Sequence, residues 1–416
     1  MTLLQYKKTT LDNGLEVYAI PCNKDSQVAS INIFYKVGSR NENMGKSGIA
    51  HMLEHLNFKS TKNRKAGEFD AIVKGFGGIN NASTGFDYTQ YFITCNKANL
   101  TTALELYSDI MQNLNLLEEE FLPEREVVLE ERRWRTDNDP IGYLFFRLYN
   151  TAFIHHPYHW TPIGFKADIK NWSIDDIKEF HAKFYQPKNA FVVVSGDIDE
   201  DEVFALVKKH FGKIKNAKEI PSVFIKEPPQ DGEKEAVVYR KSDVEFFAIA
   251  YKTPPFSSAD QPLLDALSYH LGNGKSSLLY RELVDKKGLL SSIDVINLSA
   301  IDDNLFIIIG SCNENVEAKK AIKEIEKCIA KLKAKELKDD DITKIKNNLK
   351  LELIHSLSSA SKVANLYGRY IAMGNLDNLS SSIEELEKLD SKKALLVAQK
   401  YLTDKNKTTI ILKKES

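Results

Sequence analysis

The chain has 416 residues, of which 43% are hydrophobic and 28% are charged, so it can bury ordinary cores over two or three domains. Its 57 lysines and arginines nearly balance 58 aspartates and glutamates, and a net charge of −1 argues against a general nucleic-acid or membrane-surface binder. No run reaches the roughly 18 apolar residues of a membrane span. We therefore expect neither a nucleic-acid partner nor a membrane span.

The N-terminus and the cysteines bear on the compartment. No long apolar stretch follows a basic end at the start of the sequence, which predicts a cytoplasmic protein without a signal peptide. A periplasmic location would follow instead if a signal had been removed. The cysteines form no C-x-x-C pair and no disulfide framework, and this fits a reducing compartment; they are Cys22, Cys95, Cys312 and Cys328.

The first hundred residues predict short strands with two helices between them. Two strands flank a turn at residues 12–14, and the segment QVASINIFYKVGSRNE alternates enough to form a third. A helix is expected at about 46–57, and a second short helix closes at Gly77-Gly78. INNASTGFDYTQYFITCN then gives two strands separated near residues 85–87, and the segment NLTTALELYSDIMQNLNL gives a long helix.

The helix at 46–57 carries the motif His51-Met52-Leu53-Glu54-His55. At about 100° per residue one face is apolar, with Ile49, Leu53 and Leu56, and the histidines and Glu54 cluster on the other. Imidazoles at i and i+4 stand one above the other and can share a metal ion. A nearby carboxylate can take a proton from metal-bound water, as in zinc hydrolases.

This H-x-x-E-H order is the reverse of the commoner zinc motif and is known from inverted zinc peptidases. By itself it fits a zinc site or a plain amphipathic helix with a polar outer face, and the flanking sequence has to decide.

A later helix is predicted to begin at Pro123, a good first helical residue, in PEREVVLEERRW. Glu124 and Glu131 are seven apart and share a face with Val127, Val128 and Trp134, whereas Glu130 and Arg133 point elsewhere. A carboxylate on the buried side of a helix needs a cation or hydrogen-bond donors. Glu131 is therefore either part of a site or the partner of an arginine in a buried salt bridge.

The two halves of the chain resemble each other. One similarity places Cys95 against Cys312, 217 positions on, and another places Tyr185 against Tyr401, 216 positions on. The agreement predicts a duplicated α+β domain: residues 1–214 as the first domain, 215–235 as a Lys/Pro-rich linker, and 236–416 as a homologous second domain. Each is expected to be an antiparallel-rich mixed sheet packed with helices.

The duplication also tests the histidine motif. The counterpart of residues 51–55 lies around 268–272, where His270 is kept but the rest of the constellation is absent. The counterpart of Glu131 is Asn347 or Asn348. Since only one half has the set, it is better explained as a functional site than as a requirement of the fold.

Together, HMLEHLNFKST, GGINNASTGFDYTQYF, EREVVLEE, HHPYHWTPIG and FYQPKNAFVVVSGD resemble the pitrilysin/insulinase family of inverted zinc peptidases over the whole chain. The size is closest to single-length bacterial members and to mitochondrial processing peptidase subunits. The resemblance implies a processing-peptidase-like metallohydrolase fold and a catalytic Zn²⁺. It makes His51, His55 and Glu131 the metal ligands, Glu54 the general base, and Glu124 a second carboxylate supporting catalysis.

The resemblance also implies how the enzyme holds its substrate, a peptide or an unfolded polypeptide. Asn81, Ala82, Ser83 and Thr84 match the edge strand along which family members add an extended peptide, with Asn81 near the scissile bond. For Ser83 and Thr84 an ordinary strand role explains the sequence as well. A rival metal set, His155, His156 and His159, is disfavoured because Pro157 breaks any helix that would align them.

One segment departs from the family. Active members usually carry an arginine and a tyrosine, seven apart in the second domain, that bind substrate and stabilise the oxyanion. Aligned on Gly288-Leu289, these positions hold Val284 and Ser291, and Arg281 or Tyr280 can replace them only if the helix register shifts by about a turn. We therefore predict a zinc-dependent endopeptidase subunit that works in an enclosed chamber with a homologous Arg/Tyr-bearing partner. A self-sufficient homodimer and a non-catalytic structural subunit are the alternatives.

Overall fold

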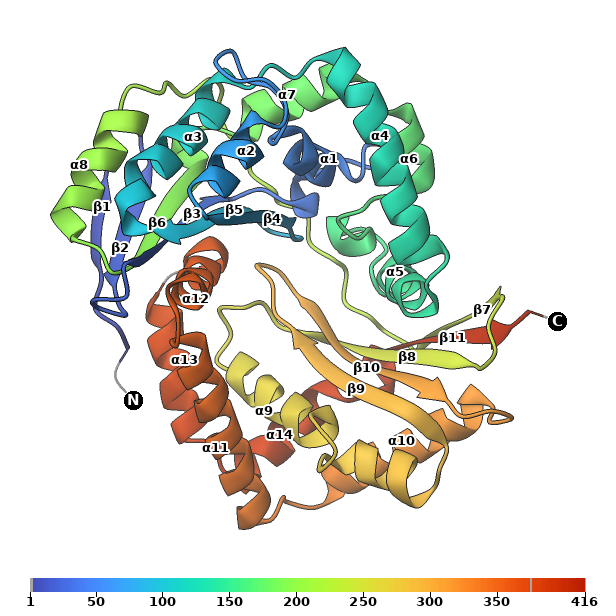
Figure 1. Ribbon diagram of the computed structural model, residues 1–416. Helices are drawn as coiled ribbons and strands as arrows, with labels where there is room; N and C mark the ends of the chain where they lie inside the picture. Colours follow the sequence, from blue (N-terminus) through green and yellow to red (C-terminus); the bar gives the residue numbers. More distant parts are fainter. Residues whose placement is uncertain (1–2, 375, 416) are drawn as a thin grey trace. The chain divides into compact units, whose positions relative to one another are not determined.

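The computed structural model describes residues 3–374 and 376–415 (Figure 1). The chain forms two compact units, each with its own sheet and hydrophobic core. Unit 1 comprises the described residues of 1–130, 160–224 and 353–376, and unit 2 comprises those of 131–159, 225–352 and 377–416.

The sheet of unit 1 has six strands in the order β1-β2-β6-β3-β5-β4 (Figure 1). β2 and β6 run parallel, and the other neighbouring pairs are antiparallel. β4 therefore lies at one edge of the sheet. The strands are β1 (Lys7–Thr10), β2 (Glu16–Pro21), β3 (Val28–Tyr35), β4 (Ile79–Thr84), β5 (Thr89–Asn96) and β6 (Ala190–Gly196).

Helices cover both faces of this sheet (Figure 1). Its central strands β3 and β6 are therefore buried on both sides. Ile31 and Ile33 of β3 join the core on the face that carries most of the helices. Phe34 points to the other face, where a Cβ at Gly368 of α12 would lie 2.1 Å from the Phe34 ring, so only glycine permits this packing. The helices are α1 (Ile49–Leu56), α2 (Glu68–Gly75), α3 (Leu100–Asn113), α4 (Glu118–Arg132), α6 (Lys166–Asn171), α7 (Ile174–Phe184), α8 (Glu200–Phe211) and α12 (Ala360–Met373).

The sheet of unit 2 has five strands in the order β7-β11-β8-β10-β9, with β7 and β11 parallel and the rest antiparallel. They are β7 (Lys234–Arg240), β8 (Phe246–Thr253), β9 (Leu290–Leu298), β10 (Asn304–Cys312) and β11 (Lys407–Lys414). Its helices are α5 (Pro140–Ala152), α9 (Gln261–Gly272), α10 (Ala318–Ala334), α11 (Asp339–Ser356, whose last turn falls in unit 1), α13 (Asp377–Glu387) and α14 (Ser391–Tyr401).

The two sheets have the same topology once β1 is set aside. The order β2-β6-β3-β5-β4 matches β7-β11-β8-β10-β9, and the parallel pair occupies the same place in both. Cys95 and Cys312 lie at the ends of the equivalent strands β5 and β10, and Tyr185 and Tyr401 lie at the ends of α7 and α14. The predicted α+β fold of two homologous, antiparallel-rich halves is confirmed.

The compact units are not contiguous in sequence. Helix α5, from the first half of the chain, packs on β8 and β11 of unit 2. Helix α12, from the second half, packs on β3 and β6 of unit 1. The boundaries 1–214, 215–235 and 236–416 describe the repeated sequence and remain a proposal.

Helix α4 differs from its prediction at both ends. It begins at Glu118 rather than at Pro123, because three glutamates in its first turn favour the positive end of the helix dipole. Pro123 lies inside the helix and removes one backbone donor. After Arg132 the chain continues as a π-helix over Arg133–Asp137, which turns the following side chains away from the α-helical positions assumed for Trp134.

No helix in the described ranges is long and apolar enough to cross a membrane. All four cysteines are free, Cys22 half-buried and the others buried. The predicted compartment stays a prediction.

Candidate metal centre

Helix α1 presents the histidine motif as predicted. Ile49, Leu53 and Leu56 are buried in the core of unit 1, while His51 and His55 are half-buried on the other side. The centroids of the two imidazole rings are 4.7 Å apart. A helix with one apolar face packed on a sheet thus holds two nitrogen donors at a fixed spacing.

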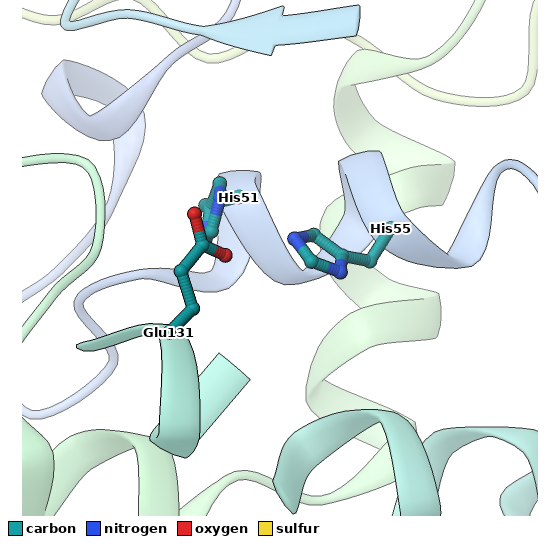
Figure 2. A group of neighbouring side chains, drawn as sticks. All are labelled: His51, His55 and Glu131. Carbon is teal, nitrogen blue, oxygen red and sulfur yellow. The ribbon is translucent and has the colours of Figure 1, made fainter. Parts of the chain in front are cut away.

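Glu131 completes a group of three potential ligands. One ligand atom from each of His51, His55 and Glu131 lies within 4.8 Å of the others. Figure 2 shows the Glu131 carboxylate reaching toward the imidazoles from a neighbouring helix. Ligand atoms of a tetrahedral zinc ion lie roughly 3.3 Å apart at bond lengths of about 2.0–2.1 Å. Two imidazoles and a carboxylate in this arrangement fit Zn²⁺ with small side-chain adjustments.

Glu131 also contacts an arginine, and its role as a metal ligand remains a proposal. Its Oε1 lies 3.1 Å from Nε of Arg135, so an arginine partner is present, but Arg135 is 66% exposed and the pair is not a buried salt bridge. The expected buried face is wrong for two neighbours, since Val127 is 49% and Trp134 is 72% exposed, whereas Val128 is buried. Glu131 belongs to the last turn of α4, whose preceding residues lie in unit 1 with α1.

Glu124 contacts a histidine of the group rather than solvent. Its Oε1 lies 2.8 Å from Nδ1 of His55, and its Oε2 lies 2.5 Å from Nζ of Lys59. The hydrogen bond with His55 and the contact with Lys59 lower the pKa of Glu124 to about 2, against the effect of burial. A carboxylate at Nδ1 fixes the ring orientation and leaves Nε2 for a metal ion. Glu124 therefore links His55 to Lys59, and its support of a metal ligand remains a proposal.

Glu54, the predicted base, forms a hydrogen bond with a residue of the edge strand β4. The Thr84 hydroxyl donates a hydrogen bond to Oε2 of Glu54. Thr84 is the last residue of β4, and its side chain lies on the face of the strand that also carries Asn80 and Ala82. The prediction left Thr84 with either a strand role or a substrate role, and the structure gives it a contact with the carboxylate expected to handle the proton.

Strand β4 is the edge strand that the sequence predicted. Asn81 and Ser83 are exposed on one face, and Ala82 is half-buried and packs against the core. The Asn81 carboxamide oxygen accepts a hydrogen bond from the backbone N–H of Ala82 at 2.9 Å. The position of β4 suits addition of an extended peptide, and the roles of Asn81, Ala82 and Ser83 remain a proposal.

Two of the three histidines in the rival set have other ring partners. Nδ1 of His156 accepts a hydrogen bond from the backbone N–H of Tyr158, and Nε2 lies 3.0 Å from Asp302. Nδ1 of His159 lies 2.5 Å from the carbonyl oxygen of Phe153. Within the described ranges, only His51, His55 and Glu131 form a cluster that could hold a metal ion.

The segment that departs from the family lies in unit 2. Val284 is half-buried in a π-helix over Tyr280–Lys286, and Ser291 on β9 bonds to the hydroxyl of Ser311 at 3.1 Å. Arg281 lines a small pocket with His270 and Lys344 of the same unit.

Glu42 has structural importance that the sequence analysis missed. It is buried, and its oxygens accept hydrogen bonds from the backbone N–H groups of Gly48 and Ala50 and from Nε1 of Trp160, each at 2.8 Å. Burial raises the pKa of Glu42 to about 8, although the three N–H groups favour its charged form. The sequence held one indication of this role. Gly48, at the start of the helix, has no side chain to cap it, so another residue has to accept hydrogen bonds from the first N–H groups.

Two family models match most of the chain. The family model described as "Insulinase (Peptidase family M16)" matches residues 17–161, and the one described as "Peptidase M16 inactive domain" matches residues 171–349. The chain belongs to the M16 (insulinase) peptidase family.

Among its relatives is the "Zinc protease PqqE" of Helicobacter pylori, 51% identical over 99% of this chain and 93% of that protein. A solved structure described as a protease from Helicobacter pylori has a TM-score of 0.97 and 51% identity, covering 99% of this chain and all of that one. A more distant relative is a probable β subunit of the mitochondrial processing peptidase of Arabidopsis thaliana, 26% identical over 96% of this chain and 76% of that protein.

Proposed function

We propose that this chain is the zinc-bearing subunit of an endopeptidase that cleaves peptides or unfolded polypeptides. The observation that carries the proposal is the convergence of His51, His55 and Glu131 within 4.8 Å. Glu54 lies between the two histidines in the sequence of the same helix. Relatives named as zinc proteases support this assignment.

The chemistry follows from the residues around the three ligands. Zn²⁺ held by His51, His55 and Glu131 would supply a Lewis acid that lowers the pKa of water toward about 7. Glu54 accepts a proton from the attacking water and returns it to the leaving amine. The Thr84 hydroxyl holds one oxygen of Glu54, and Glu124 fixes the ring of His55. Two side chains, Thr84 and Glu124, thus position the groups proposed to act on the peptide.

Strand β4 is proposed to bind the substrate backbone. A peptide added at this edge would run beside Asn81, Ala82 and Ser83 and pass near Thr84, which contacts Glu54. Main-chain hydrogen bonds bind peptides with little regard to sequence. This suits an enzyme for extended or unfolded chains.

The proposed enzyme needs a second, homologous chain that supplies an arginine and a tyrosine, with substrate enclosed in a chamber between the two. Val284 and Ser291 stand at the positions where active family members carry these groups, and loss of an oxyanion donor typically costs about 10²–10³ in rate. The Arabidopsis relative is itself named as a subunit. A homodimer that is active by itself is the alternative assembly.

The test is metal content together with activity. We expect the purified chain to bind one zinc ion, to cleave a quenched peptide poorly, and to gain activity with its Arg/Tyr-bearing partner. Glu54→Gln should keep the zinc and abolish cleavage by the assembly. Full activity of the single chain would overturn the need for a partner, and absence of zinc would overturn the proposed chemistry.

A non-catalytic structural subunit is the second candidate. The match of residues 171–349 to a domain described as inactive favours it, but the complete set in the first half, with Glu54 and Glu124 in place, favours catalysis. Glu54→Gln separates the two, because a structural subunit would support the partnered activity equally well with glutamine at this position.

A further inference from the structure

We propose that Glu42 is a positioning residue for the metal ligands: its carboxylate caps the N-terminus of α1 and so fixes the approach of His51. The inference rests on the proposed zinc site but concerns residues outside the ligand set. Glu42 lies in the loop between β3 and α1, nine residues before His51.

The geometry shows that Glu42 replaces a conventional cap. Helix α1 starts after Gly48, which has φ +89° and no side chain to accept a hydrogen bond. Oε2 of Glu42 accepts from the N–H of Gly48 and Oε1 from the N–H of Ala50, both at 2.8 Å. The oxygens of Glu42 thus satisfy two N–H groups at the helix start that have no acceptor within the helix. Ala50 directly precedes His51, so the cap fixes the backbone next to the first ligand.

The same carboxylate ties the helix to a distant segment. Nε1 of Trp160 donates to Oε2 of Glu42 at 2.8 Å, and both residues are buried. A Cβ at Gly48 would lie 2.7 Å from the Trp172 ring and 2.8 Å from the Ile163 carbonyl oxygen. Residues 160–172 therefore enclose the start of α1, and Glu42 is the acceptor that connects them to the helix N–H groups.

A second acidic residue at this turn provides a matched control. Oδ2 of Asp168 accepts from the backbone N–H of Ser47 at 3.1 Å and from its hydroxyl at 2.6 Å. Ser47 precedes the helix, so Asp168 stabilises the loop without capping the donors of Gly48 and Ala50. Glu42→Gln and Asp168→Asn both replace one carboxyl oxygen by an amide NH₂ with little change in the size of the side chain.

The experiment measures zinc affinity of the full-length chain by competition with a chromophoric chelator, with circular dichroism to confirm folding. In Glu42→Gln the amide NH₂ faces N–H donors, and we expect zinc affinity to fall about tenfold, at the lower end of the effect of residues that orient metal ligands. Asp168→Asn should lower the melting temperature but change zinc affinity less than about twofold. This contrast separates positioning from general stabilisation.

Trp160→Phe supplies an independent variant, because it removes the Nε1 donor and keeps a smaller aromatic side chain at this buried position. If Glu42→Gln does not fold, Trp160→Phe decides: weaker zinc binding supports the proposal and unchanged affinity overturns it. Wild-type zinc affinity in folded Glu42→Gln, or equal losses in Glu42→Gln and Asp168→Asn, would also overturn it. A wild-type chain that binds no zinc would instead refute the proposed function, which is a separate outcome.

Discussion

Glu124 lies 2.8 Å from Nδ1 of His55 and also contacts Lys59, so one carboxylate joins a proposed metal ligand to a cation. Helix α4 carries both Glu124 and Glu131, seven residues apart. The helix thus carries the proposed ligand Glu131 and also Glu124, which contacts the proposed ligand His55. This shared origin makes the metal site sensitive to the position of α4 on α1.

We expect Glu124→Gln to weaken zinc binding about 10–100-fold, because the neutral amide no longer orients and polarises His55 as the carboxylate does. Chelator competition measures the change. Glu126→Gln is the control, since Glu126 lies on the same helix with a side chain that is 66% exposed. Equal zinc affinity in the two variants would contradict the role given to Glu124.

Glu131→Gln should abolish stoichiometric zinc binding at micromolar concentrations, because a neutral amide oxygen is a poor substitute for a carboxylate ligand. The adjacent Glu130→Gln should bind zinc normally, since Glu130 is exposed. Metal analysis after desalting distinguishes them. Retention of zinc by Glu131→Gln would show that the ion is held by other groups.

Thr84→Val keeps the shape of the side chain and removes the hydrogen bond to Glu54. We expect kcat of the active assembly to fall about tenfold or more, in line with loss of a hydrogen bond to a charged group, with little change in zinc content. Thr84→Ser should restore most of the activity. The prediction fails if Thr84→Val is as active as the wild type, or if it loses its zinc.

The lowered pKa of Glu227 makes the unfolding free energy depend on pH. Burial by itself would raise its pKa, but the backbone N–H groups of residues 154–156 and the Lys252 ammonium outweigh burial and lower the pKa to about 2. The usual value is 4.5. The ionised carboxylate of Glu227 therefore stabilises the fold fully above about pH 4.5. This contribution to the unfolding free energy disappears as the pH falls toward about 2.

The corresponding variant is Glu227→Gln, which should lose at most about 3 kcal/mol of unfolding free energy at pH 7 and less at pH 3. Urea unfolding followed by circular dichroism at both pH values measures it. Glu219→Gln, at an exposed position eight residues before Glu227, should match the wild type at both pH values. A loss that is as large at pH 3 as at pH 7 would refute the assignment.

The sequence by itself determined most of the local elements and placed His51, Glu54 and His55 together on α1. Apolar residues three and four apart fixed which face of α1 is buried, so the opposite face had to carry His51 and His55. The offset between Cys95 and Cys312 identified the duplication, because equivalent strands occupy equivalent places in two copies of one fold. These features depend on short-range periodicity, which the sequence states directly.

Only the tertiary structure decided which distant residues meet. Helix periodicity could not show that α4 begins before Pro123, that the chain after Arg132 becomes a π-helix, or that Trp134 is exposed. The contact of Thr84 with Glu54 and the cap that Glu42 places on α1 join different elements. Such contacts depend on how elements pack together, and no spacing along one helix or strand encodes that packing.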